Sequence, residues 1–174
     1  MRYEHLVQIN DLEQPLIPVL ERSQLWSGVL ARAEHPALFD PTIDATRELR
    51  RDGNRVEREV HRGASSTRET VRLWPEESIE VEIGGATDYT GSSLTIAIEE
   101  PARRALFLRF KYELRGPAAA IAESEQGALR QAYHHANLEL VRRIRALAAA
   151  VPGTDSGDES FADRALRPGH GGAR

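Results

Sequence analysis

Hydrophobic and polar residues alternate along most of the chain from residue 44 to residue 114, which is typical of half-buried β-strands. The first ten residues alternate in the same way, with Tyr3, His5, Val7 and Ile9 on one side. Turn sequences separate the runs: Asp52-Gly53, Gly63-Ala64, Trp74-Pro75-Glu76-Glu77 and a loop from Gly84 to Gly91. The pattern predicts about seven strands, all antiparallel, because no helix separates consecutive strands of the main run.

Helical spacing replaces the alternation at two places. Pro15 and Pro18 prevent a long helix before Arg22, and Ser23 is predicted to cap a short helix that runs to about Glu34. After residue 117, good helix formers take over, and the apolar positions are Leu129, Tyr133, Ala136, Leu140, Ile144 and Leu147. This spacing predicts a long helix from about Gly127 to Ala150, which Pro152-Gly153 ends.

The turn at Gly63-Ala64 predicts the register of the two strands beside it. If these residues form a two-residue loop, Arg58 lies opposite Glu69 on a face that is otherwise apolar. Two charges on such a face must be paired or hydrated. We expect either a polar anchor for a ligand in a cavity or a structural ion pair at a sheet edge, unless a bulge turns Arg58 out to solvent.

The order of elements predicts an α+β fold in which a curved antiparallel sheet grips the C-terminal helix. That helix, of about 24 residues and roughly 36 Å, is the only element long enough to cover the apolar face of the sheet. The space between a curved sheet and a single helix tends to be a cavity. We assign residues 1–151 to this domain and expect residues 152–174, which are polar and glycine-rich, to form a disordered tail.

Composition removes several classes of function. The 174 residues include no cysteine, which excludes disulfides and thiolate metal sites, and the two adjacent histidines His134 and His135 cannot easily share a metal on one helix. The net charge is -4, so the arginines between residues 47 and 72 indicate a solvated charge ladder rather than a nucleic-acid surface. No apolar run approaches the roughly 20 residues of a membrane span, and no signal-peptide core is present, so we expect a cytoplasmic protein.

Four segments resemble the AtaL-like branch of the SRPBCC superfamily, which includes START proteins, birch-pollen allergens and polyketide cyclases. They are Tyr3-Glu4-His5-Leu6-Val7-Gln8-Ile9-Asn10, Leu25-Trp26-Ser27-Gly28, Arg58-Glu59 with Gly63-Ala64, and Glu99-Glu100-Pro101 to Leu106-Phe107-Leu108-Arg109-Phe110. The resemblance covers about residues 1–151. It implies a helix-grip fold with a hydrophobic ligand cavity, and it implies no catalytic residues, because the branch has no agreed ones.

Seven residues are candidates for the wall of this cavity: Trp26, Arg58, Glu69, Phe110, Tyr112, Tyr133 and Asn137. Tyr112 on the sheet and Tyr133 on the helix are placed to offer hydroxyls at opposite walls, although packing is the commoner role of such tyrosines. Asn137 shares a helix face with Tyr133 and is either a cavity group or a partner for neighbouring helix residues. Core packing is the ordinary role of Trp26.

We therefore expect a protein that binds a small hydrophobic or aromatic metabolite, lipid-like or polyketide-like, without a metal or other cofactor. Two alternatives stay open. One is an enzyme of the cyclase or dehydratase kind, in which Arg58 and Glu69 or the tyrosines move protons on the ligand. The other is an interaction module that uses a sheet edge or Phe107, for which a homodimer is the expected assembly.

Overall fold

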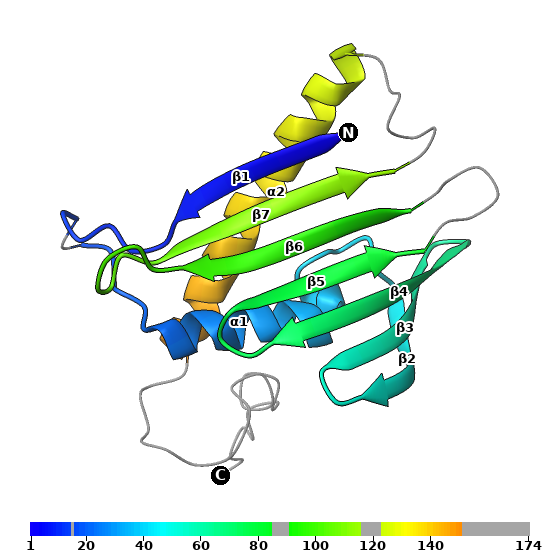
Figure 1. The fold of residues 1–174 in the computed structure, drawn as a ribbon, viewed down its shortest axis with the longest axis horizontal. Coiled ribbons are helices and arrows are strands. Elements are labelled where there is room, and N and C mark those ends of the chain that lie inside the picture. Colours follow the sequence, from blue (N-terminus) through cyan, green and yellow to red (C-terminus); the bar gives the residue numbers. More distant parts are fainter. Residues whose placement is uncertain (15, 85–90, 116–122, 151–174) are drawn as a thin grey trace, which may run out of the picture.

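A single antiparallel sheet with helices on one of its faces makes up the fold (Figure 1). The structure is a computed structural model, and it describes residues 1–14, 16–84, 91–115 and 123–150. Most of the predicted loop between Gly84 and Gly91 and the whole predicted tail, residues 152–174, lie outside the described residues.

The sheet has seven strands among the described residues, as the alternating pattern predicted. They are β1 (Arg2–Gln8), β2 (Ala45–Asp52), β3 (Arg55–Arg62), β4 (Ser65–Trp74), β5 (Ser78–Ile83), β6 (Ser92–Glu99) and β7 (Phe107–Leu114). Their order in the sheet is β1-β7-β6-β5-β4-β3-β2, and every neighbouring pair is antiparallel. The first strand therefore lies beside the last one.

The two tight hairpins show how turn residues determine register. Strands β3 and β4 pair with Arg58 opposite Glu69, as predicted from a Gly63-Ala64 loop, and Gly63 has a positive φ of 56°. The preceding turn lies one residue later than predicted. Asp52 still pairs with Arg55, so the loop is Gly53-Asn54, and Gly53 with φ 54° is its first residue.

Three helical segments lie on the same side of the sheet (Figure 1): α1 (Arg22–Glu34), the short 3-10 helix η1 (Pro36–Leu38) and α2 (Glu123–Ala150). Helix α2 crosses behind β1, β7 and β6, and α1 contacts α2, β5 and β6. The predicted long helix is confirmed, but it begins four residues before Gly127.

The predicted cap of α1 is wrong. Ser23 lies inside the helix, where its carbonyl accepts a hydrogen bond from the Ser27 hydroxyl at 2.9 Å. The helix is capped at Glu21, whose backbone N–H donates to the Gln24 side chain at 2.9 Å. The Gln24 side chain, three residues after the cap, satisfies the backbone N–H of Glu21, whereas the Ser23 side chain does not.

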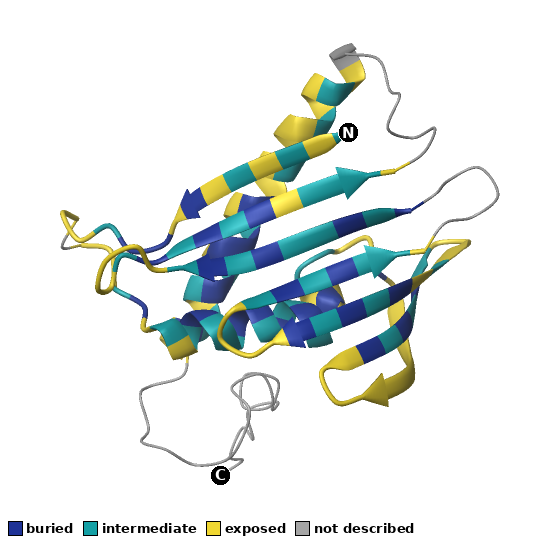
Figure 2. Cartoon of the chain, viewed as in Figure 1, coloured by how far each residue is buried: buried dark blue, intermediate teal, exposed yellow. Residues whose placement is uncertain are grey.

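The core lies between the sheet and the two long helices, and buried residues alternate with less buried ones along each inner strand (Figure 2). The buried face of α2 differs from the predicted stripe, since Asn137, Leu140, Val141, Ile144 and Ala148 are buried while Ala136 is exposed. Helix α2 packs on α1 as well as on the sheet, so its buried face is rotated from the predicted one. At the α1–α2 contact, a Cβ on Gly28 would lie 2.5 Å from Ile144 Cγ2, so only glycine fits there.

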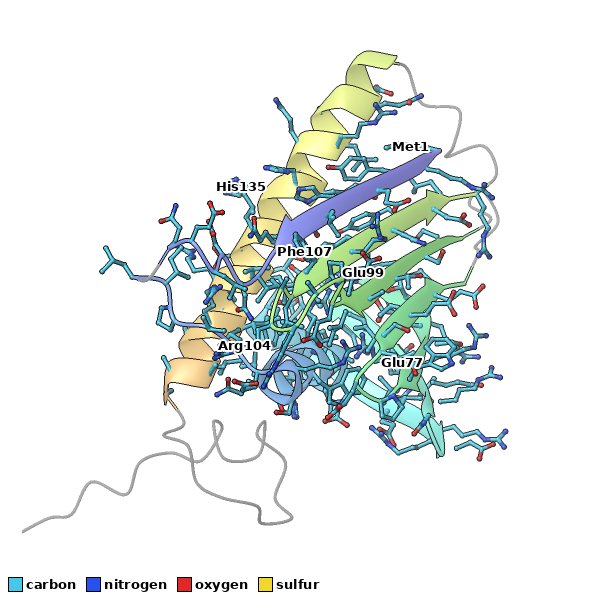
Figure 3. The ribbon with its side chains drawn as sticks, turned by 60° about the vertical axis from the view of Figure 1, so that its left-hand side comes forward. Met1, Glu77, Glu99, Arg104, Phe107 and His135 are labelled. Atoms are coloured by element: carbon cyan, nitrogen blue, oxygen red, sulfur yellow. The ribbon has the colours of Figure 1, made fainter. Side chains whose placement is uncertain are left out.

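The outer face of the sheet carries the predicted charge ladder. Arg72 bonds Glu80 and Glu82 at 2.9 and 3.1 Å, and Arg47 bonds Glu59 at 2.8 Å. Glu99 and Phe107, labelled in Figure 3, lie opposite each other in the register of β6 and β7. Within the part of the chain that the structure describes, no helix is both long enough and apolar enough to cross a membrane.

Candidate ligand-binding site

A cavity of about 620 Å³, open to solvent on one side, lies between the inner face of the sheet, the α1–η1 segment and α2. Its apolar wall consists of Phe39, Pro41, Leu94, Ile96, Phe110 and Leu140. On α2 the small side chains Ala132 and Ala136 face the same space, where larger side chains would fill it. The polar groups at the wall are Arg32, Asp40, Tyr112, His135, Asn137 and Glu139, of which His135 is labelled on α2 in Figure 3.

A smaller cavity of about 160 Å³ adjoins the first and has a more polar wall. It includes Arg58, Glu69 and Tyr133. Arg32, Leu94 and Tyr112 line both cavities, so these three side chains form the boundary between an apolar and a polar compartment.

The Arg58–Glu69 pair faces inward and is almost completely buried, with 5% and 3% of the two residues exposed. Arg58 Nε and Nη2 donate to Glu69 Oε2 at 2.9 and 2.7 Å, and Nη1 donates to the Ala33 carbonyl on α1. The register of β3 and β4 is continuous through both residues, so no bulge turns Arg58 outward. The pair therefore ties the neighbouring strands β3 and β4 to helix α1.

Arg32 is among the cavity residues that sequence reasoning missed. It lies on α1 and lines both cavities, and no described residue forms a hydrogen bond or ion pair with its guanidinium. Burial is the main cause that lowers the pKa of Arg32, and the positive charge of Arg58 lowers it further, against the opposite effect of Glu69 and Asp40. Its position in the sequence could have revealed it. Arg32 follows Leu25 by seven residues, which is about two helical turns, so both residues lie on the buried face of the helix.

Tyr112 and Tyr133 do not occupy opposite walls, as the sequence had suggested. Their rings stack at a centroid distance of 3.9 Å and an angle of 11°. They meet because β7 and α2 lie against each other at this end of the sheet. Together the two rings form a continuous aromatic surface beside Arg32 at the boundary of the two cavities.

A hydrogen-bonded chain runs from the cavity toward β1. The Tyr112 hydroxyl donates to Asn137 Oδ1 at 2.6 Å, and Asn137 Nδ2 lies 3.3 Å from His5 Nδ1. Burial raises the pKa of Tyr112, so its hydroxyl stays a proton donor at neutral pH. Burial and the neighbouring His134, whose ring centroid lies 4.4 Å away, lower the pKa of His5. Asn137 thus lines the cavity, and its partners lie on strands β7 and β1 rather than on its own helix.

Six of the seven candidate residues line a cavity. Phe110 and Asn137 line the larger one, Arg58, Glu69 and Tyr133 line the smaller one, and Tyr112 lines both. Trp26 lines neither, and its side chain packs against the hydrophobic core. Among the described residues, no group of three or more histidine, aspartate or glutamate side chains is arranged to hold a metal ion.

The comparison with protein families decides where this chain belongs. Residues 7–150 match the model of AtaL, described as acetylaranotin biosynthesis cluster protein L. The chain belongs to the AtaL family. None of the curated proteins matches this AtaL-family chain.

Solved structures show that this AtaL-family protein has the helix-grip fold. The di-domain ARO/CYC StfQ of the steffimycin pathway is similar with a TM-score of 0.64 and 14% identity, over 86% of this chain and 51% of StfQ. The chain thus spans about half the length of StfQ. The ZhuI aromatase/cyclase of Streptomyces sp. R1128 has a TM-score of 0.57 and 14% identity, over 86% of this chain and 93% of ZhuI. A START superfamily protein of Mycobacterium smegmatis has a TM-score of 0.56 and 13% identity, over 84% and 98%.

Proposed function

We propose that this AtaL-family protein binds a small hydrophobic or aromatic metabolite, lipid-like or polyketide-like, in the 620 Å³ cavity. The observation that carries the proposal is the wall of this cavity, which is mostly apolar and has polar groups at the boundary with the smaller cavity. Sites for small molecules typically have about 300–1,000 Å³, apolar walls and a few polar groups that orient the ligand. The likeness to proteins described as aromatase/cyclases and START proteins supports the same class of ligand.

The proposal assigns different roles to the two parts of the wall. Leu94 and Phe39 would contact the apolar body of the ligand, and the buried Phe110 and Ile96 would form the layer behind them. Arg32 and the Tyr112–Asn137 pair would orient the ligand, because they are the polar groups nearest the smaller cavity.

Cavity filling tests the proposal. Ala136→Trp places a large side chain in the cavity, whereas Ala146→Trp adds the same bulk at an exposed position of α2 that does not line it. We expect native mass spectrometry and thermal shift with aromatic polyketides and fatty acids to detect a ligand on the wild type and Ala146→Trp, but not on Ala136→Trp. No ligand at high micromolar concentration, or equal binding by Ala136→Trp, would contradict the proposal.

A second candidate function is cyclisation or dehydration of the bound ligand. The Tyr112 hydroxyl favours it, because it lines the cavity and is held at 2.6 Å from Asn137 Oδ1; to act as a general acid it would turn its proton from Asn137 to the ligand. Incubation with a linear poly-β-ketone should then yield a product that has lost water. Tyr112→Phe should abolish that product even at saturating ligand, and an unchanged rate in Tyr112→Phe would reject Tyr112 as the acid.

Self-association stays a prediction as well. All residues of the edge strand β2 are exposed, and a free strand edge can pair with a second copy of the chain. Light scattering coupled to size exclusion would detect a homodimer, and a strict monomer at high concentration would argue against it. The cytoplasmic location and the absence of a nucleic-acid partner also stay predictions.

A further inference from the structure

The acidic side chains that line the two cavities are already paired. Among the described residues there are four, and each lies beside an arginine other than Arg32. The pairs are Glu69 with Arg58 at 2.7 Å, Asp40 with Arg62 at 3.5 Å, Glu113 with Arg2 at 2.9 Å, and Glu139 with Arg143 at 2.9 Å. Among the described residues of the cavity walls, Arg32 is therefore the arginine that forms no ion pair with a carboxylate.

Arg32 also differs from Arg58 in the use of its donors. Arg58 donates to Glu69 and to the Ala33 carbonyl, so most of its N–H groups are occupied. Arg32 has no such partner, although its side chain is partly buried at the boundary of the two cavities. A guanidinium removed from water without a partner destabilises the folded protein, unless an anion supplies the missing interactions.

We propose that Arg32 binds the carboxylate of a hydrophobic acid whose apolar body occupies the 620 Å³ cavity. This inference rests on the proposed function and narrows its ligand to a class. A guanidinium matches a carboxylate because its planar N–H groups can donate to both oxygens at once. A monoanion also matches the single charge of Arg32. The buried Arg58–Glu69 pair would then hold Arg32 in position, because Arg58 also donates to the Ala33 carbonyl and so fixes α1 against the sheet.

Matched acid and amide probes test the inference. Naphthalene-2-carboxylate and dodecanoate are each compared with their primary amides by isothermal titration calorimetry at pH 7.5. The variants are Arg32→Gln and, as a control, Arg103→Gln, because Arg103 is exposed and lines neither cavity. The amides keep the shape and apolar surface of the acids but lack the charge.

We expect the wild type and Arg103→Gln to bind at least one acid about tenfold or more tightly than its amide, since a hydrogen bond to a charged group is worth about 1.5–3 kcal/mol, or roughly 10-fold to 150-fold. Arg32→Gln should lose this preference and keep the affinity for the amide. Amide binding with no preference for the acid in the wild type would overturn the inference and leave the proposed function intact. Binding of neither acids nor amides would overturn both.

A second variant tests the same inference even where Arg32→Gln fails to fold. Arg32→Met removes the charge and retains most of the apolar side-chain volume. It should raise the melting temperature of the ligand-free protein, because the wild type contains a partly buried cation without a partner. It should also lose the acid preference. A lower melting temperature together with an unchanged acid preference would show that Arg32 supports the fold and not the ligand.

Discussion

The Glu69 carboxylate accepts two hydrogen bonds from Arg58 through one oxygen, at 2.9 Å from Nε and 2.7 Å from Nη2, inside the sheet. Both side chains are at most 5% exposed. The arginine also donates to the Ala33 carbonyl, so the pair joins β3, β4 and α1. Because neither charge can reach water, loss of one partner leaves the other buried and unpaired.

Glu69→Leu should therefore lower the free energy of unfolding by about 3–5 kcal/mol, as expected when one member of a buried ion pair is removed. Urea denaturation monitored by circular dichroism measures the loss. The double variant Arg58→Met/Glu69→Leu should recover most of it, because no unpaired charge remains.

The matched control for this prediction is the exposed pair Arg47–Glu59 on the outer face. Glu59→Leu should lower stability far less than Glu69→Leu, since surface ion pairs contribute little. Equal losses for the inner and the outer pair would show that burial of Glu69 does not matter.

Gly28→Ala should destabilise the protein, although alanine is the better helix former. The added Cβ would lie 2.5 Å from Ile144 Cγ2, and we expect a net loss of about 1–3 kcal/mol from the displaced helices. Gly127→Ala on α2 is the control, because nothing lies within 4 Å of its Cβ position. That variant should gain up to about 1 kcal/mol from helix propensity. A gain for both variants would mean that α1 and α2 are not in close contact.

Tyr112→Phe should cost about 1–3 kcal/mol, because it leaves the buried Asn137 Oδ1 without its 2.6 Å hydrogen bond. A double-mutant cycle with Asn137→Leu isolates this interaction. In the Asn137→Leu background the same tyrosine change should cost clearly less, since no amide is left unsatisfied. Additive losses in thermal or urea unfolding would indicate that the two side chains are not coupled.

His5 should make stability depend on pH between neutral and mildly acidic conditions. Burial and His134 lower the pKa of His5 below the 6.5 of the unfolded chain. Below about pH 6.5 the unfolded chain binds more protons than the folded one, so stability falls as the pH decreases through the folded pKa. Protonation at Nδ1 would also remove the acceptor that faces Asn137 Nδ2 at 3.3 Å.

Unfolding midpoints at pH 7.5 and pH 5 measure this effect, and His5→Gln is the reference. The variant should lose less stability than the wild type between these two values. NMR titration should place the pKa of His5 below 6.5 and move it upward in His134→Gln. A His5 pKa at or above 6.5 in the folded protein would refute the assignment.

The sequence by itself determined the strands, the Gly63-Ala64 hairpin and the register that places Arg58 opposite Glu69. These features follow from local rules, since a strand repeats every two residues and a two-residue turn fixes which residues face each other. It also determined that a long helix follows the last strand. Its buried face was misjudged at Ala136, because periodicity allows several neighbouring faces and packing against α1 selects one.

Only the tertiary structure decided which side chains from distant elements meet. Tyr112 on β7, Asn137 on α2 and His5 on β1 are far apart in sequence, and their contacts depend on how α2 crosses the sheet. The spacing of Arg32 along α1 placed it on the buried face, but nothing local shows that every cavity carboxylate is already paired. A buried charge can be compensated by any residue that the fold brings near, so its missing partner becomes visible only when all the elements are in place.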